Sequence, residues 1–347
     1  MSGTSLDGVD VVCCEIDRET CTLLYAKEYA FPLDLKAKIL GAIDSHSSLK
    51  NLGEIDHALG IVFAHCVLDF LKIFSLNHRE IRAIGLHGQT LWHNPQGAFP
   101  FSMQGGDANI LTALSGIEVI ADFRRKDIAL GGQGAPFAPA FHAFLFGSLS
   151  QNIALVNIGG MANISVLGAK LIGYDTGCGN VLLDLWIAQH LQQSYDKDGK
   201  WAREGTLNQV LLKAFLADSY FTKPYPKSTG RERFNRHWLA SFALEKYRPQ
   251  DVQATLLELT AQSIALEVKH FALDKLLLCG GGAKNTFLCE RLADLLPLLC
   301  IEIAPFADEM EAMTFAWLAY KRIHKEPVHL KEVTGARENT ILGASYV

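Results

Sequence analysis

Residues 153–167 read IALVNIGGMANISVL, two apolar runs joined by a pair of glycines. Each run has the length of a strand, and Gly159 and Gly160 can form a turn between them without side-chain clashes. The stretch therefore predicts a β-hairpin. A glycine turn also lets backbone N–H groups approach an anion closely, so this hairpin is a candidate ligand site as well as a structural element.

Short strand patterns alternate with helical patterns on both sides of this hairpin, which predicts an α/β fold. Directly after it, residues 171–174 predict a strand that leads through Gly177 and Gly179 into a helix. Further strands are predicted at residues 9–16, 23–31, 83–86, 118–121 and 275–279, and helices at residues 51–74, 180–193, 252–271, 285–296 and 309–323. Residues 220–235 are the least regular stretch and predict a surface loop.

The composition argues against several classes of protein. The chain has 347 residues, with 32 Lys and Arg against 37 Asp and Glu and a net charge of −5, and no long basic block that would bind nucleic acid. No run of about 18 apolar residues predicts a membrane span, and the N-terminus does not resemble a secretory signal, so we expect a cytoplasmic protein. The length favours two domains with a ligand between them.

The eight cysteines are scattered along the chain, without a CxxC pair and without histidines at zinc-ligand spacing. In a chain of this size such cysteines are most simply reduced and mostly buried. The sequence therefore predicts neither a disulfide nor a structural metal site.

Two more glycine-rich segments accompany predicted strands. They are GTSLDG at residues 3–8 and GGG at residues 280–282. One glycine turn is weak evidence for a ligand, but three of them, the first rich in hydroxyl groups and carrying Asp7, indicate a phosphorylated ligand. None matches the GxxxxGK[ST] phosphate loop or the GxGxxG dinucleotide turn, so the phosphate site is of another type.

Motifs along nearly the whole chain resemble those of one enzyme family. They are MSGTSLDGVD at residues 1–10, LHGQTLWHNP at 86–95, ADFRRKDIALGGQGAPFAPAFH at 121–142, NIGGMANISVL at 157–167, GYDTGCGNVLLD at 173–184, KSTGRERFN at 227–235, CGGGAKN at 279–285 and MEAMTFAWLA at 310–319. Together they resemble the anhydro-N-acetylmuramic acid kinases. The resemblance implies the two-lobed α/β fold of actin-like ATPases, which is ribonuclease H-like, with mixed sheets flanked by helices and an interdomain cleft.

That family uses ATP and water to convert 1,6-anhydro-N-acetylmuramic acid into N-acetylmuramic acid 6-phosphate, a step in peptidoglycan recycling. The resemblance implies a first lobe of residues 1–126 and 313–347 and a second lobe of residues 127–312. ATP and Mg²⁺ would be the cofactors, and the protein would be a homodimer.

The resemblance also implies a nucleotide site. Thr4 and Ser5 would donate to the phosphates, and Asp7 would hold Mg²⁺ through water. From the residues alone, this segment fits an ordinary hairpin or helix start equally well. The residues expected at the nucleotide are Gly3, Thr4, Ser5, Leu6, Asp7, Gly8, Val9, Asp10, Gly159, Gly160, Gly280, Gly281 and Gly282.

Asp175 is the candidate catalytic base. It is predicted to end a strand just before a glycine turn, where α/β enzymes often place reacting groups. The alternative is that Asp175 caps the next helix or satisfies the turn. By the resemblance, Asp175 takes a proton from the water that attacks the anomeric carbon of the sugar, while the departing O6 attacks the γ-phosphate.

The candidate sugar contacts are polar groups that follow predicted strands. Arg124 and Arg125 suit a carboxylate such as the lactyl group of muramic acid, although they also fit a solvated charge cluster. His87 and Gln89 can reach sugar hydroxyls or can be structural. Glu311 is implied as a contact to the sugar or the water, but its spacing from Asp308 also fits a helix capping box, which needs no ligand.

The sequence departs from the family pattern at two places. Members usually have a short apolar strand before the MSGTS motif, so we expect that this strand is missing here and that the first loop is anchored more weakly. Cys178 stands where the family usually has proline between two glycines. A buried, inert thiol is the favoured interpretation, and a reactive thiol is the alternative.

Four functions, from three different classes, fit parts of this pattern. A sugar kinase that also opens the anhydro ring accounts for most of the motifs. A glycoside hydrolase with Asp175 and Glu311 as its carboxylate pair leaves the three glycine turns unexplained. The remaining alternatives are another sugar kinase of this fold and a non-catalytic nucleotide-binding regulator.

Overall fold

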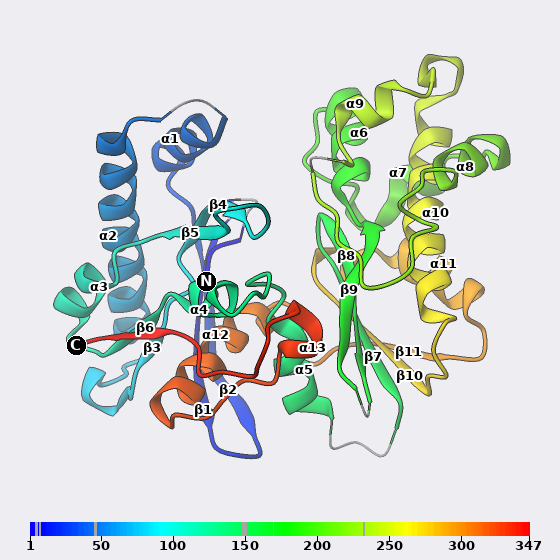
Figure 1. The fold of residues 1–347 in the computed structure, drawn as a ribbon. Helices are drawn as coiled ribbons and strands as arrows, with labels where there is room; N and C mark the ends of the chain where they lie inside the picture. The colour runs from blue at the N-terminus through cyan, green and yellow to red at the C-terminus, as the bar shows by residue number, and fades with distance from the viewer. Residues whose placement is uncertain (4–5, 7, 45–46, 148–150, 169, 232) are drawn as a thin grey trace. The chain divides into compact units, whose positions relative to one another are not determined.

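The chain folds into two compact units (Figure 1). The computed structural model describes residues 1–3, 6, 8–44, 47–147, 151–168, 170–231 and 233–347. Unit 1 comprises Met1–Leu145 and Glu309–Val347, and unit 2 comprises Phe146–Asp308. Residues 127–145 and 309–312, which the resemblance implied for the second lobe, thus group with unit 1. Each unit combines strands with helices, which confirms the α/β class.

Unit 1 combines short sheets with helices. Its elements are β1 Gly8–Ile16, β2 Cys21–Ala30, α1 Leu33–Asp44, α2 Leu49–Ile73, η1 His78–Glu80, β3 Ile84–Gly85, β4 Gln89–Asn94, β5 Phe101–Gly105, α3 Ala108–Ser115, β6 Val119–Ala121, α4 Phe123–Ala129, α5 Ala138–Phe146, α12 Met310–Ile323, α13 Lys331–Thr334 and β12 Ala344–Tyr346. The strands predicted at residues 9–16 and 23–31 are confirmed, and they pair antiparallel as β1 and β2. In a second sheet, β6 lies between β3 and β12, and β4 and β5 form a separate two-stranded sheet.

The core of unit 1 forms around helix α2. Ile55, Leu59 and Phe63 are buried on one face of this helix, as the helical spacing of apolar residues predicted. Its N-terminus is capped by Ser48, whose side chain accepts a hydrogen bond from the N–H of Asn51. The boundary residues 127–145 are tied to the C-terminal part of the chain within this unit, because Thr334 hydrogen-bonds to the side chain of Asp127 and to the N–H of Gln133.

Unit 2 contains one five-stranded mixed sheet with helices packed against it (Figure 1). Its elements are β7 Ile153–Ile158, β8 Met161–Leu167, β9 Ile172–Cys178, α6 Val181–Leu191, η2 Lys197–Gly199, α7 Lys200–Arg203, α8 Gln209–Leu216, α9 Arg236–Ala240, η3 Leu244–Lys246, α10 Pro249–Val268, β10 Lys275–Cys279, η4 Gly281–Lys284, α11 Thr286–Leu295 and β11 Cys300–Ile303. The strand order is β11-β10-β7-β8-β9. The predicted hairpin of β7 and β8 is confirmed, and β10 runs parallel to β7.

Helix α10 is buried over most of its length and contacts β8, β9, α6, α8 and α11. Such a helix is a rigid support, because nearly every side chain is fixed by packing.

Across the described residues of both units, none of the helices has the length and apolar character needed to cross a membrane.

Strand β9 is longer than the sequence predicted. Its pairing with β8 continues through Gly177 as far as Cys178, and Thr176 is an extra residue at a bulge in the register. Gly177, with φ of +154°, has the backbone freedom that this bulge requires. The prediction that Asp175 ends a strand is therefore wrong, since Asp175 lies inside β9.

Candidate active site

Asp175 is held by three hydrogen bonds from one neighbouring segment. The backbone N–H of Thr229 donates to its carboxylate oxygen Oδ2 at 2.9 Å. The N–H of Asp175 donates to the carbonyl of Lys227 at 3.1 Å, and the hydroxyl of Tyr220 donates to the carbonyl of Asp175 at 2.7 Å. The side chain of Asp175 is half-buried, so its position is fixed while it stays accessible. Helix α6 takes Asn180, and not Asp175, as its N-cap residue.

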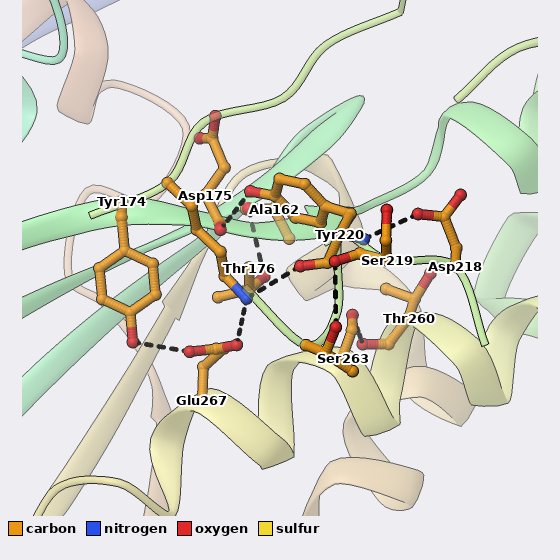
Figure 2. Close-up of polar contacts among 12 residues, drawn as sticks. Ala162, Tyr174, Asp175, Thr176, Asp218, Ser219, Tyr220, Thr260, Ser263 and Glu267 are labelled. Carbon is orange, nitrogen blue, oxygen red and sulfur yellow. Dashed lines mark hydrogen bonds and ion pairs between the residues drawn. The ribbon is translucent and has the colours of Figure 1, made fainter. Parts of the chain in front are cut away.

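A buried ion pair connects this segment to helix α10. Nζ of Lys227 lies 2.6 Å from Oε1 of Glu267, and the two side chains are only 3% and 7% exposed. The hydroxyl of Tyr174 donates to the other carboxylate oxygen of Glu267 at 2.9 Å, as Figure 2 shows. Burial and the Glu267 carboxylate raise the pKa of Tyr174, which keeps this hydroxyl a donor. The pair is therefore hydrogen-bonded in the way that buried charges require.

The ends of the same loop are fixed by Asp218. Its carboxylate accepts hydrogen bonds from Nε of Arg233 at 3.0 Å and from Nε1 of Trp238 at 2.9 Å. Burial alone would raise the pKa of Asp218, but the hydrogen bonds, led by that from Arg233, lower it overall. The stretch predicted as a surface loop is thus exposed at residues 222–226 and anchored to the core at Tyr220, Lys227 and Phe234.

The two glycine turns of unit 2 lie at the ends of neighbouring parallel strands. Gly159 follows β7 and Gly280 follows β10, and the last pair in the register of these strands is Cys279 opposite Asn157. A Cβ added at Gly280 would lie 2.2 Å from Oδ1 of Asn157, so the second turn packs tightly against the first strand. The fold therefore brings together two turns that the sequence presented separately, at the sheet edge where α/β proteins bind ligands.

The turn at Gly159 and Gly160 also lies next to the start of helix α6 and to the guanidinium of Arg231. The carbonyls of Gly159 and Gly160 accept hydrogen bonds from the N–H groups of Asn180 and Gly179 at 2.8 and 2.9 Å, beside the first turn of α6. Among the described residues, a Cβ added at Gly160 would meet only Nη2 of Arg231 within 4 Å, at 3.9 Å. The turn is thus open enough for a ligand to approach, with an exposed guanidinium next to it.

Gly280→Ala is expected to lower the free energy of unfolding by about 1–3 kcal/mol and to raise KM for ATP. The cause is that Gly280 has φ of +78°, which alanine rarely adopts, and has no room for a Cβ. Thermal unfolding and ATP titrations measure both effects. Gly168→Ala is the matched control for stability, because no atom of the described residues lies within 4 Å of its added Cβ. Equal losses of stability in the two variants would contradict the explanation.

In unit 1, the segment before β1 has an uncommon backbone. The N–H of Leu6 donates to the carbonyl of Gly3 at 3.2 Å, and Leu6 has φ of 55° with a buried side chain. A bulky residue in this conformation is strained and needs surrounding structure to hold it, which is common at functional loops. Gly8 begins β1, and the side chain of Val9 is buried while that of Asp10 is half-buried. The predicted ligand contacts that lie outside the described residues are Thr4, Ser5 and Asp7.

Arg124 and His87 form a partly buried pair in unit 1. Nη1 of Arg124 donates to the carbonyl of Gly134 at 2.7 Å, and Nη2 lies 2.8 Å from Nε2 of His87. Because a guanidinium only donates, Nε2 of His87 is the acceptor and its proton is on Nδ1. Burial and the charge of Arg124 lower the pKa of His87 well below its usual value, so His87 is neutral. Burial lowers the pKa of Arg124 to about 10, which leaves it charged.

The loop that accepts from Arg124 is fixed by Asp127. This buried carboxylate accepts hydrogen bonds from the N–H of Gly134 at 2.7 Å and from the hydroxyl of Thr334 at 2.8 Å. Burial raises its pKa, and these hydrogen bonds oppose that effect. Because Thr334 belongs to the C-terminal part of unit 1, Asp127 groups with that unit.

The other predicted sugar contacts have different surroundings. Gln89 begins β4 and is buried, and its Oε1 accepts a hydrogen bond from the hydroxyl of Ser2 at 2.6 Å. Arg125 is exposed, and its Nε lies 3.0 Å from Oδ1 of Asp122 in a surface ion pair. Such pairs contribute little to stability.

Glu311 does not belong to a capping box, so that alternative is wrong. Helix α12 takes Glu309 as its N-cap residue, and Asp308 forms an ion pair with Lys284 at 2.8 Å. The side chain of Glu311 is accessible to solvent. Desolvation by the atoms around it nevertheless raises its pKa, an effect that the charge of Arg124 partly offsets.

Known proteins match this chain over its full length. A family model described as AnmK, anhydro-N-acetylmuramic acid kinase, matches residues 1–347. A curated anhydro-N-acetylmuramic acid kinase from Sulfurovum sp. (strain NBC37-1) is 58% identical, covering 100% of this chain and 98% of the relative. The chain belongs to this family. Enzymes of the same description from Sulfurimonas denitrificans and Aliivibrio fischeri are 53% and 50% identical, covering 100% of this chain and 98% and 97% of the relatives.

As a member of the anhydro-N-acetylmuramic acid kinase family, the chain is a kinase and uses ATP as its phosphoryl donor. Among solved structures, the activator of the 2-hydroxyisocaproyl-CoA dehydratase from Clostridium difficile aligns with 65% of this chain and 87% of that chain, at 14% identity and a TM-score of 0.37. A likeness of this strength supports no conclusion about this kinase.

Sequence reasoning missed several residues around Asp175 in this kinase. The missed residues are Tyr174, Tyr220, Lys227, Thr229, Arg231 and Glu267. One signal was present: Glu267 is a charged residue on a strongly apolar helix, which indicates a buried partner. The partner itself cannot be identified from the sequence, because Lys227 lies 40 positions away.

Cys178 of this kinase is expected to resist alkylation in the folded protein. It is fully buried, and burial raises its pKa to about 12, so at pH 8 only about one thiol in ten thousand is ionised. Peptide mass spectrometry after iodoacetamide treatment measures this, with exposed Cys300 as the accessible reference. Alkylation of Cys178 to the same extent as Cys300 in folded protein would favour the reactive-thiol interpretation instead.

Proposed function

We propose that this chain is an ATP-dependent kinase that converts 1,6-anhydro-N-acetylmuramic acid and water into N-acetylmuramic acid 6-phosphate in peptidoglycan recycling. The observation that carries the proposal is the match of the family model to all residues of the chain. The geometry around Asp175 supports it, because a half-buried carboxylate that is oriented by the N–H of Thr229 suits a general base.

In the proposed reaction, Asp175 accepts a proton from a water molecule as that water attacks the anomeric carbon C1. The bond from C1 to O6 breaks, and the electron pair stays on O6. O6 then forms a bond to the γ-phosphorus of ATP, and ADP leaves with the electrons of the broken bond. The N–H of Thr229 holds the carboxylate of Asp175 in place before the proton arrives, since it donates to Oδ2.

The glycine turns of unit 2 are the proposed contacts for ATP. A Cβ added at Gly159 or Gly160 would make only ordinary van der Waals contacts with the described residues, and Arg231 lies beside Gly160, which fits an anionic phosphate. We assign Gly280, Gly281 and Gly282 to the same nucleotide, and the segment 3–10 of unit 1 to its phosphates.

Mg²⁺ is the proposed metal, and carboxylates are the ligands that suit it. Asp7 is the assigned ligand through water, and the half-buried Asp10 carries the same chemistry at the start of β1. When bound, the ion would neutralise charge on the phosphates.

For the sugar, we assign Arg124 to the lactyl carboxylate, with His87 and Glu311 beside it and Gln89 and Arg125 as outer contributors. A charged guanidinium whose nitrogens are already oriented by Gly134 and His87 loses little freedom on binding. The family resemblance further supports a cytoplasmic homodimer, whose mass light scattering would measure.

The test is to incubate the protein with the anhydro-sugar and Mg²⁺, with and without ATP, and to identify the products by mass spectrometry. We expect a phosphorylated reducing sugar only when ATP is present. An unphosphorylated reducing sugar formed without ATP would favour the hydrolase, and no product under either condition would contradict the proposed function.

A further inference from the structure

We infer that the buried ion pair of Lys227 and Glu267 is a positioning device for Asp175, an inference that rests on the proposed role of Asp175. Strand β9 is at the edge of the five-stranded sheet, so its outer side has no sheet partner among the described residues. Residues 220–229 lie along this outer side of β9 and hydrogen-bond to Asp175. The position of the proposed base therefore depends on what holds this segment.

The segment forms hydrogen bonds with both the backbone and the carboxylate of Asp175. The carbonyl of Lys227 accepts from the N–H of Asp175, and two residues later the N–H of Thr229 donates to its carboxylate. The hydroxyl of Tyr220 adds a third hydrogen bond, which it donates to the carbonyl of Asp175 (Figure 2). A slip of the segment by one residue would break the contacts of Lys227 and Thr229 together.

The segment has little structure of its own. Residues 221–229 lie in neither a helix nor a strand, and residues 222–226 are exposed and include Pro224 and Pro226. Its fixed points are side chains: buried Tyr220, Tyr225 with its ring stacked 5.2 Å from that of Tyr174, and Lys227 in its ion pair. Of these three, Lys227 is the nearest in sequence to Thr229, so it controls where the Thr229 N–H lies.

The other end of the pair is rigid. Glu267 is in the last turn of α10, the buried helix that packs on the sheet, and the hydroxyl of Tyr174 fixes its second oxygen. Tyr174 precedes Asp175 in β9, so the network begins and ends on the same strand. Breaking the ion pair releases the segment, and a misplacement of about 1 Å at a reacting group can cost about 10²-fold in rate.

The experiment compares Lys227→Met, Lys227→Arg and a matched control. Lys227→Met is expected to lower kcat about 10- to 100-fold while KM for ATP and for the anhydro-sugar stays within about threefold. Lys227→Arg keeps the charge and is expected to recover most of kcat. The control is Glu258→Gln. Glu258 lies nine residues before Glu267 on the same helix, and the substitution breaks its ion pair with Arg291. It is expected to reduce thermal stability and to leave kcat within about threefold.

Two further measurements separate positioning from folding and from the proposed function. The double variant Lys227→Met with Glu267→Leu removes both buried charges and is expected to stay folded, with kcat still at least about 10-fold low. Hydrogen exchange at residues 172–178 needs no turnover and is expected to be faster in Lys227→Met than in Glu258→Gln. A wild-type kcat in the double variant, or unchanged exchange, would overturn the inference. A wild-type protein without kinase activity would overturn the proposed function and leave the exchange result to decide the inference.

Discussion

Asp175→Asn is expected to lower kcat for the anhydro-sugar by about 10² to 10⁴ or more. Asparagine has nearly the same shape and still offers an oxygen to the N–H of Thr229, but it cannot take the proton of the attacking water. No base then activates the water that attacks C1, so the C1–O6 bond is not cleaved. Without this cleavage, O6 cannot accept the phosphoryl group. Steady-state assays of ADP and sugar phosphate formation measure both halves of the reaction.

Both products are expected to fall together in Asp175→Asn, because one proton transfer starts both steps. The matched control is Asp251→Asn, which removes a charge near the start of α10 where Asp251 accepts from the N–H of Thr206. That variant is expected to keep kcat within about twofold. If Asp175→Asn were folded and had near-normal turnover, Asp175 would not be the base.

Arg124→Lys is expected to raise KM for the anhydro-sugar about 10- to 100-fold, in line with the 1.5–3 kcal/mol typical of hydrogen bonds to charged groups. Lysine keeps the positive charge but loses the fork of donors that orients a carboxylate. It also loses the joint contact to the carbonyl of Gly134 and to Nε2 of His87, which sets the direction of the guanidinium. Initial rates over a range of sugar concentrations measure the change.

Arg125→Lys is the matched control, because Arg125 is adjacent in sequence but exposed and paired with Asp122 at the surface. Its KM is expected to stay within about threefold of the wild-type value. A large rise for Arg125→Lys with little change for Arg124→Lys would assign the lactyl carboxylate to Arg125. Loss of stability in Arg124→Lys is monitored by thermal unfolding, so that KM is compared between folded proteins.

Local features of the fold could be predicted from the sequence. The hairpin of β7 and β8 follows from two apolar runs around Gly159 and Gly160, and helix α2 follows from apolar residues at helical spacing. The end of β9 could not be predicted, because it depends on pairing with β8 through a bulge at Thr176. Pairing across strands overrides the local signal of Gly177, which by itself predicts a turn.

The site was predictable only as a set of separate candidates. Glycines, Asp175 and Arg124 could be identified by residue type and motif, whereas the partners that orient them are distant in sequence. The capping box of Glu311 failed for a similar reason, since Asp308 pairs with Lys284 and not with the helix. Contacts of this kind depend on tertiary packing, which no local spacing encodes.

The most direct test of the account is turnover of the anhydro-sugar and ATP in water labelled with ¹⁸O. If the water deprotonated by Asp175 attacks C1, the label appears in the C1 hydroxyl of the sugar 6-phosphate, and the transferred phosphoryl group carries none. Mass spectrometry of the product and its fragments locates the label. Label in a phosphate released from ATP, with no label at C1 of the phosphorylated sugar, would contradict the coupled mechanism.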